Sequence, residues 1–183
     1  YAPVIDVSPN KVVSNRSFGL NMDTVISFSN EFISVTQSHN IIATAKHFPG
    51  HGFVKGDTHK ELIYIDGEMK EVKNYPPLIE NGVLSVMVAH LAIKNNQEFN
   101  TEGMPSTCSK KIVTDLLKDS LGFKGLVITD AMNMGGVVNV KNSGLKAAIA
   151  GCDQLLMPVD EKQVLFNILG YMNDNEGFKQ QIY

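Results

Sequence analysis

Short apolar runs rich in β-branched residues alternate along this chain with longer segments of helical periodicity. Residues 23–39 repeat apolar side chains at helical spacing, and the buried-strand pattern 41–48 follows them. Alternation of this kind predicts a parallel sheet with right-handed crossovers, either a doubly wound sheet or a (β/α)₈ barrel. The predicted strands are 2–7, 41–48, 84–93, 126–129 and 154–157, and the predicted helices are 23–39, 77–81, one from Pro105 that stops at Gly122, 144–150 and 161–172.

The number of predicted strands indicates whether the chain can form a complete barrel. A complete (β/α)₈ barrel has eight strands and needs about 250 residues, whereas this sequence of 183 residues predicts about five. The chain also begins directly on a strand pattern. We therefore expect residues 1–183 to form part of a single barrel domain, an incomplete barrel that lacks its N-terminal units.

Composition and charge exclude several classes of partner. With 43% hydrophobic and 19% charged residues, the chain has the composition of a globular domain with a substantial core. The net charge of -3 and the scattered basic residues favour neither nucleic acid nor an anionic membrane as a partner. No apolar run reaches the roughly 18 residues of a spanning helix. Cys108 and Cys152 are predicted to be buried free thiols rather than a disulfide.

The segment from Lys46 to Gly52, followed closely by Asp57-Thr58-His59, holds the densest chemistry of the chain. Three of the five histidines fall within thirteen residues here, directly after the strand pattern 41–48. In parallel α/β folds the loops beyond the carboxyl ends of the strands carry the functional groups. This basic, imidazole-rich cluster therefore predicts a functional site.

Two further segments follow predicted strands in the same way. Asp130 directly follows the apolar strand 126–129, where a carboxylate can act as nucleophile, base or metal ligand. Arg16 lies in the loop after the first predicted strand and is a candidate ligand contact. Met132 and Met134 are expected to serve packing rather than chemistry.

Together these segments resemble glycoside hydrolase family 3, and more narrowly its β-N-acetylglucosaminidase branch. The matching motifs, in family order, are Ala2-Pro3-Val4-Ile5-Asp6, Asn15-Arg16-Ser17-Phe18-Gly19, Lys46 through Gly52, Asp57-Thr58-His59, Pro105-Ser106-Thr107 and Phe123 through Asp130. The histidine motif with its Asp-Thr-His sequel is highly specific. The resemblance implies a (β/α)₈ barrel that needs no cofactor and no metal.

The resemblance also implies roles for single residues. Asp130 would be the nucleophile that forms a covalent glycosyl-enzyme, and His59 the general acid/base, oriented by Asp57 on a mobile loop. The sugar at the nonreducing end would be bound by Arg16, Lys46 and His47. Asp6 is a further pocket candidate, which could equally hold Arg16 or cap the loop.

Elementary chemistry is compatible with these roles. A retaining glycosidase needs a carboxylate that attacks the anomeric carbon and a second group that protonates the leaving oxygen and then activates water. An imidazole with an ordinary pKa of about 6.5 can do both near neutrality, and a neighbouring aspartate can hold its tautomer. Asp57 and His59 can meet only in a turned loop, which Gly56 makes easier. His51 is expected to shape the turn.

The sequence thus predicts an exo-acting β-N-acetylglucosaminidase that removes terminal N-acetylglucosamine, with retention, from bacterial cell-wall muropeptides or chitin-derived oligosaccharides. A phosphorylase, another family 3 β-glycosidase and a non-catalytic sugar-binding protein stay open as alternatives. A metal-dependent, amidohydrolase-like barrel is the alternative of another class, with the ligands His47, His51, Asp57, His59 and Asp130. Lys46 would place a cation inside that ligand set, which argues against it. Compartment (cytoplasm, cell envelope or secreted) and oligomeric state are not determined by the sequence.

Overall fold

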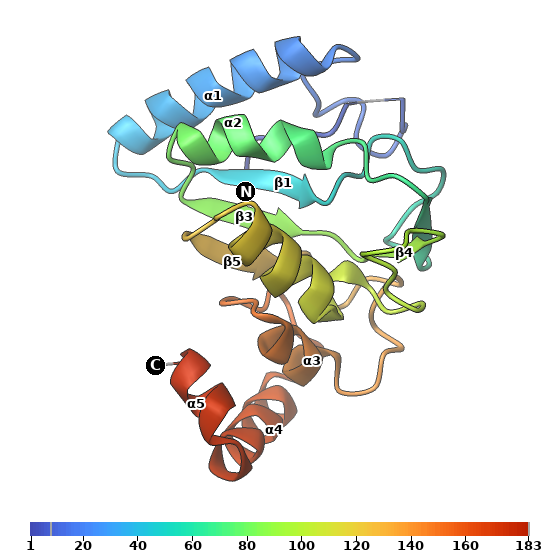
Figure 1. Ribbon diagram of the computed structural model, residues 1–183, viewed down its shortest axis with the longest axis vertical. Coiled ribbons are helices and arrows are strands. Elements are labelled where there is room, and N and C mark those ends of the chain that lie inside the picture. Colours follow the sequence, from blue (N-terminus) through green and yellow to red (C-terminus); the bar gives the residue numbers. More distant parts are fainter. Residues whose placement is uncertain (8, 183) are drawn as a thin grey trace.

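The computed structural model describes residues 1–7 and 9–182 and has a parallel sheet at its centre (Figure 1). The sheet consists of β1 (Thr44–Phe48), β3 (Ser85–Val88) and β5 (Leu126–Thr129), in the order β1-β3-β5. Isolated parallel bridges add Val4 beside β1 and Gln154 beside β5. Five parallel segments therefore lie side by side in chain order, without the reversal that marks a doubly wound sheet. This order is that of a (β/α)₈ barrel, seen here as an open part of one.

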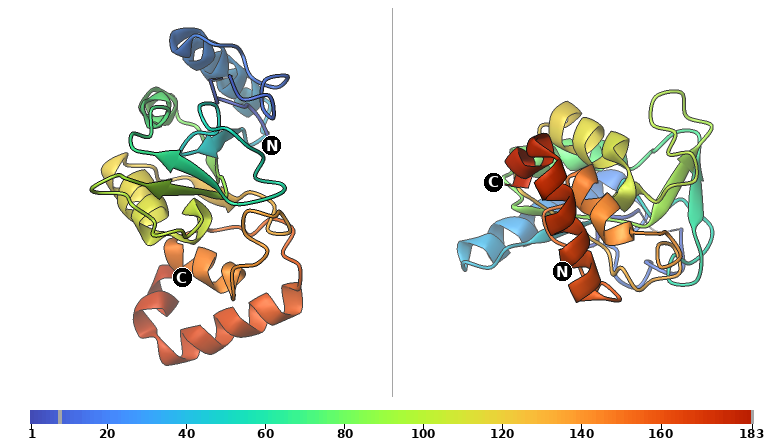
Figure 2. Two further views of the ribbon diagram at one scale, coloured as in Figure 1. Left: turned by 90° about the vertical axis from the view of Figure 1, so that its right-hand side faces the viewer. Right: turned by 90° about the horizontal axis from the view of Figure 1, so that it is seen from below.

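Helices follow the strands along the chain. They are α1 (Met22–Ser38), η1 (Val72–Asn74), α2 (Tyr75–Glu80), η2 (Ser106–Cys108), the π-type helix η3 (Lys111–Ser120), α3 (Ser143–Ala150), α4 (Glu161–Asp174) and α5 (Glu176–Ile182). Two helices have side-chain N-caps. The side chain of Asn21 accepts a hydrogen bond from the Thr24 amide at the start of α1, and Asp160 caps α4 in the same way. Helix α1 lies at one end of the molecule and α4 and α5 at the other, with the sheet between them (Figure 2).

The strands of the sheet are almost completely buried, as expected of parallel strands covered on both faces. Their carboxyl ends point toward the right-hand side of Figure 1, where long loops gather around a second, two-stranded parallel ribbon. This ribbon pairs β2 (Ile63–Asp66) with β4 (Leu91–Lys94). The residues that the sequence predicted to be functional lie in the loops at this end and, for Lys46 and His47, in the last residues of β1.

Several predicted elements differ from the observed ones. The apolar run 84–93 is two strands, β3 and β4, separated at Ala89 and His90, because the chain leaves the sheet there to pair with β2. The helix predicted from Pro105 is the short η2 followed by η3, and the strand 154–157 contributes a single bridge at Gln154. The strand β2 and the helix α5 were not predicted.

Two composition-based expectations can be compared with the fold. Both cysteines are free thiols, as predicted, although only Cys152 is fully buried and Cys108 is half-buried. Burial raises the pKa of the Cys108 thiol to about 11, so it is protonated near neutrality. Among residues 1–7 and 9–182, no helix is both long and apolar enough to cross a membrane.

Candidate active site

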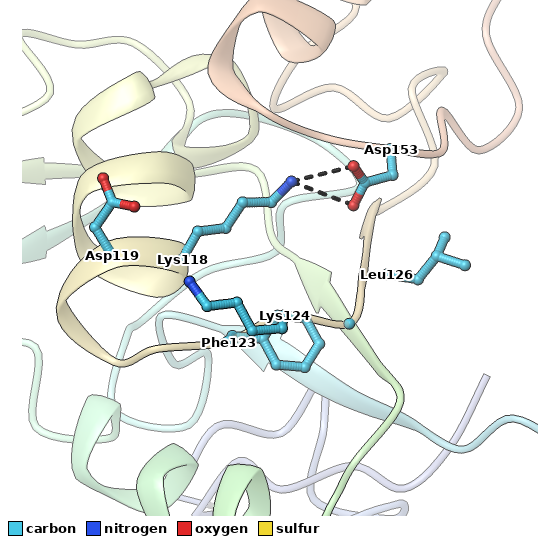
Figure 3. Close-up of a pocket in the computed structure, with 7 residues that line it drawn as sticks. Lys118, Asp119, Phe123, Lys124, Leu126 and Asp153 are labelled. Atoms are coloured by element: carbon cyan, nitrogen blue, oxygen red, sulfur yellow. Dashed lines mark hydrogen bonds and ion pairs between the residues drawn. The ribbon is translucent and has the colours of Figure 1, made fainter. Parts of the chain in front are cut away.

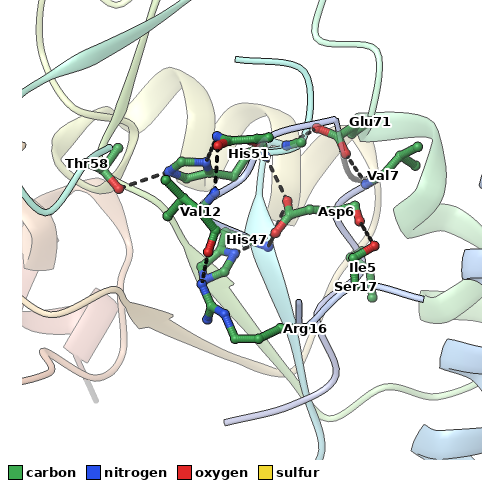
Figure 4. Close-up of polar contacts among 12 residues, drawn as sticks. Ile5, Asp6, Val7, Val12, Arg16, Ser17, His47, His51, Thr58 and Glu71 are labelled. Atoms are coloured by element: carbon green, nitrogen blue, oxygen red, sulfur yellow. Dashed lines mark hydrogen bonds and ion pairs between the residues drawn. The ribbon is translucent and has the colours of Figure 1, made fainter. Parts of the chain in front are cut away.

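The loop after β1 is built around the buried carboxylate of Asp6 (Figure 4). One carboxylate oxygen of Asp6 accepts from His47 Nδ1 at 2.6 Å, and the other accepts from the backbone amide of His51 at 2.7 Å. The backbone amide of His47 also lies 3.2 Å from Asp6 Oδ2. Asp6 therefore anchors the histidine loop, which is one of the two alternatives that the sequence left open for it; a contact of Asp6 with the sugar stays a prediction.

The charge on Asp6 determines which nitrogen of His47 carries the proton. Burial by itself raises the pKa of Asp6, but the charge and hydrogen bond of His47 and the backbone hydrogen bond of His51 outweigh it and lower that pKa. An ionised carboxylate only accepts hydrogen bonds, so Nδ1 of His47 must be protonated. His47 Nε2 is then left for a ligand, as an acceptor in the neutral ring and as a donor in the imidazolium.

Lys46 and Arg16 place two cations beside this network. The register between β1 and β3 shifts between Lys46 and Phe48, so His47 forms a bulge at the end of the strand. Lys46 is half-buried, and burial first, with the charge of Arg16, lowers the pKa of its amino group, while Asp130 and Asp6 act in the opposite direction. The charges of Arg16, Asp130 and Asp6 therefore all act on the Lys46 amino group at the carboxyl end of the sheet.

The guanidinium of Arg16 is exposed and makes a weak hydrogen bond of 3.3 Å with the Val12 carbonyl, so most of its donors are available to a ligand. The next residue, Ser17, donates its hydroxyl to the Asp6 carbonyl at 2.6 Å. Arg16 is therefore positioned next to the segment that carries Asp6, and its contact with the sugar stays a prediction.

His51 shapes the loop, as predicted. Its Nε2 lies 2.9 Å from Thr58 Oγ1, and its Nδ1 lies 3.0 Å from Asn10 Nδ2. Because the amide nitrogen of Asn10 donates, Nδ1 of His51 accepts and Nε2 carries the proton that goes to Thr58. Burial lowers the pKa of His51, although the charge of Asp6 opposes this shift. His51 is thus a neutral link between the histidine loop and the segment that holds His59.

A buried carboxylate that the sequence did not reveal, Glu71, supports the outer side of the histidine loop. Glu71 Oε1 accepts from the Val7 amide at 2.6 Å and Oε2 from the Gly52 amide at 2.8 Å. A Cβ on Gly50 would come within 2.5 Å of Glu71, so glycine is required for this close approach. Burial and the charge of Asp6 raise the pKa of Glu71 to about 7, against the backbone hydrogen bonds that favour its charged form.

Asp57 and His59 meet in a turn, as the sequence predicted. His59 Nδ1 lies 2.7 Å from Asp57 Oδ1, and the same oxygen accepts from the His59 amide at 3.0 Å. The side-chain and backbone hydrogen bonds of His59 are the main causes that lower the pKa of Asp57. Nδ1 of His59 therefore carries a proton, and its Nε2 is left to exchange protons with a ligand. The imidazole is 59% exposed, so a ligand can reach it.

Asp130 lies directly after β5, as predicted, and is half-buried. Its amide donates to the Val88 carbonyl at 2.8 Å, and its Oδ1 accepts from the Ala131 amide at 2.8 Å. Next to it, the fully buried His90 has its Nε2 3.0 Å from the Ala131 carbonyl. His90 was not predicted as a functional residue because apolar residues flank it on both sides; a break after β3 would have marked it as a strand-end residue like Asp130.

Two open hollows differ in their relation to these residues. One, of about 580 Å³, lies at the amino end of β5, where Lys118 and Asp153 pair at 3.1 Å (Figure 3). Asp153 also accepts from the Val127 amide of β5 at 2.7 Å, so its carboxylate joins the segment after α3 to the sheet. The other, of about 520 Å³, lies at the opposite end and is lined by Asn10 and Asp57 among other residues. Only the second adjoins the candidate site.

The histidines have protein partners, and this bears on the metal-site alternative. Within the part of the chain that the structure describes, no three His, Cys, Asp or Glu side chains come together in a group that could hold a metal ion. The five ligands of the amidohydrolase-like alternative are instead divided between the Asp6 network, the Asp57 pair and the end of β5.

Fold and site together define a barrel protein with a carboxylate, a half-buried lysine and a buried histidine at its strand ends, and an Asp-His pair with an exposed imidazole in a neighbouring loop. The sequence matches the glycosyl hydrolase family 3 N terminal domain over residues 1–182. The chain therefore belongs to glycosyl hydrolase family 3. The match is to the N-terminal domain of that family.

Individual relatives agree with this assignment. A beta-hexosaminidase of Vibrio cholerae serotype O1 is 34% identical over 165 residues, which are 86% of this chain and 48% of that protein. A beta-N-acetylglucosaminidase/beta-glucosidase of Cellulomonas fimi is 30% identical over 173 residues, 85% of this chain and 31% of that protein. The structure of a family 3 beta-N-acetylglucosaminidase from Paenibacillus sp. str. FPU-7 superposes with a TM-score of 0.89 at 27% identity, covering 100% of this chain and 38% of the other. The chain thus spans about half the length of the Vibrio relative, or less of the others.

Proposed function

We propose that this protein is a retaining exo-β-N-acetylglucosaminidase that hydrolyses terminal N-acetylglucosamine from muropeptides or chitooligosaccharides through a covalent glycosyl-enzyme. The observation that carries the proposal is the Asp57–His59 pair, which leaves His59 Nε2 free and lies on a segment bonded to the one that follows Asp130. A carboxylate and a proton-transfer group on neighbouring loops at one end of the sheet are the two parts that a retaining glycosidase requires.

In the first step, a carboxylate oxygen of Asp130 attacks the anomeric carbon while the bond from that carbon to the leaving oxygen breaks. The leaving oxygen takes the proton from Nε2 of the His59 imidazolium. Asp57, held ionised by its hydrogen bonds with His59, stabilises the imidazolium before the transfer and fixes its tautomer throughout. The products of this step are the released aglycone alcohol and an ester between Asp130 and the sugar.

In the second step, neutral His59 accepts a proton from water at Nε2 as the water oxygen attacks the anomeric carbon. The ester bond breaks, and Asp130 leaves as a carboxylate. The sugar departs with the same anomeric configuration as the substrate, because two inversions have occurred. The imidazolium is restored, which returns both groups to their starting states.

Recognition of the sugar falls to the groups around Asp6. Lys46 and Arg16 offer cationic donors for ring hydroxyls, and His47 Nε2 offers a third polar atom whose orientation Asp6 holds. Preference for an N-acetylated sugar is supported by the similarity to the Paenibacillus protein, a beta-N-acetylglucosaminidase. The Cellulomonas protein carries both activities in its name, so a plain β-glucoside is the alternative substrate to test.

The deciding experiment compares the full-length protein on an aryl N-acetyl-β-glucosaminide and on the corresponding β-glucoside. We expect faster turnover of the N-acetylated substrate, with the β-anomer of the free sugar as the first product by nuclear magnetic resonance. Equal or better turnover of the glucoside would overturn the substrate assignment. Release of sugar 1-phosphate when inorganic phosphate is added would make the protein a phosphorylase, since an imidazole acid/base does not repel that anion.

A further inference from the structure

The segment after Asp130 and the segment that carries His59 are joined main chain to main chain. The Gly135 amide donates to the His59 carbonyl at 2.9 Å, and the Gly136 amide donates to the Thr58 carbonyl at 2.9 Å. These two consecutive hydrogen bonds join the loop beyond β5 to the loop beyond β1, which are more than seventy residues apart in the sequence. The acid/base residue is thus held by its own carbonyl.

Both positions require glycine because the two segments touch there. A Cβ on Gly135 would overlap the carbonyl group of Lys60, which is main chain and cannot rotate away. A Cβ on Gly136 would lie 3.0 Å from the Cβ and the carbonyl oxygen of His90 and 3.2 Å from the Thr58 carbonyl oxygen. Neither glycine has a left-handed φ, so alanine is compatible with the local backbone conformation and the clash is with the neighbouring segment alone.

The two segments differ in how firmly the sheet holds them. The buried side chain of His90 holds the Asp130 segment. Its Nε2 donates to the Ala131 carbonyl, and its Nδ1 lies 2.9 Å from Thr107 Oγ1. A carbonyl only accepts, so Nε2 of His90 carries the proton, and burial, which lowers its pKa, keeps the ring neutral. The His59 segment is instead held to other loops by the hydrogen bond between the Thr58 hydroxyl and His51, and by the two hydrogen bonds from the glycine amides.

We propose that Gly135 and Gly136 form a docking site for the His59 segment and set the position of the acid/base imidazole relative to Asp130. Both glycines are positioning residues, because they act through the main chain of the His59 segment. The inference rests on the proposed function, since it assigns His59 the proton transfers described above.

The test is Gly135→Ala in the full-length protein, assayed on a series of aryl glycosides of the sugar that the wild-type protein cleaves. Displacing a general acid should slow phenyl glycosides by about 100-fold or more, the low end of what such catalysis contributes, while dinitrophenyl glycosides change little. Azide, which attacks the covalent intermediate without a general base, should partly restore turnover. Gly170→Ala on α4 is the control, since nothing lies within 4 Å of its added Cβ, and it should behave as wild type.

Gly136→Ala provides a second, milder variant, in which the neighbouring atoms need to move by only a few tenths of an ångström. We expect it to show the same leaving-group dependence as Gly135→Ala with a smaller loss, at an unchanged melting temperature. A loss in either folded variant that is equal for all leaving groups, or no loss at all, would overturn the docking role. A wild-type protein that cleaves no aryl glycoside would instead refute the proposed function, so the two failures are distinguishable.

Discussion

Replacing Glu71 with glutamine tests how the histidine loop is held from its outer side. Both carboxylate oxygens accept backbone hydrogen bonds, from Val7 at 2.6 Å and from Gly52 at 2.8 Å. A glutamine amide offers one acceptor and one NH₂ donor, so one of these two buried amides would lose its acceptor. Such a loss costs about 1–3 kcal/mol, and we expect the variant to be less stable than wild type by that amount at about pH 5.

The difference in stability between wild type and Glu71→Gln should shrink as the pH rises. The pKa of Glu71 is raised from 4.5 to about 7 in the fold, so between these values the native state binds more protons than the unfolded chain. Stability from this group is therefore lost with rising pH. This rise in the pKa corresponds to about 3 kcal/mol of stability, most of which is lost between about pH 5 and pH 8. Glutamine does not titrate, so the stability of Glu71→Gln should not show this decrease with rising pH.

The assay is chemical denaturation of wild type and Glu71→Gln over this pH range, with the exposed Glu68→Gln as control. Taking the difference between wild type and variant removes the titrations that both share. We expect the gap to close or reverse by about pH 8, and the control to follow wild type. A gap that widens with pH would mean that the backbone donors lower the pKa of Glu71, and would refute the reasoning.

Two further changes concern the site itself. Asp130→Ala removes the attacking carboxylate, so turnover should be nearly abolished for all substrates, dinitrophenyl glycosides included. A rate of one tenth of the wild-type rate or more would contradict the role of Asp130 as nucleophile. Asp6→Asn can no longer accept from both His47 Nδ1 and the His51 amide, and should lower kcat/KM by the equivalent of about 1.5–3 kcal/mol, the range for hydrogen bonds to charged groups. Wild-type kcat/KM in this variant would show that the carboxylate does not orient His47.

The fold was largely predictable where burial leaves a local pattern. The strand 126–129 was predicted with the bounds that β5 has, because Gly125 and Asp130 flank three apolar residues and a β-branched threonine. The run 84–93 shows the limit of this signal: β3 and β4 are both buried, so the sequence stays apolar through the point where the chain changes partner. The strand β2 was missed although Ile63, Tyr64 and Ile65 are β-branched or aromatic, because a run of four residues is a weak signal and its partner β4 is distant in the sequence.

The site was predictable as far as it consists of strand-end residues. Asp6, Lys46, His47 and Asp130 come together because parallel strands bring their carboxyl ends to one edge. The supporting residues were hidden for a physical reason. Glu71 acts on the Val7 amide 64 positions away, and a glutamate within a polar segment gives no sign that it will be buried.

The most direct test of the account is the dependence of rate on leaving group in His59→Ala. If His59 protonates the leaving oxygen, the variant should lose about 100-fold or more with phenyl glycosides and much less with dinitrophenyl glycosides. Its covalent intermediate should accumulate, azide should partly restore turnover, and Asp57→Ala should show the same pattern more weakly. A loss that is uniform across leaving groups and is not rescued by azide would contradict the account, since His59 would then bind substrate or support its loop and another residue would have to transfer the proton.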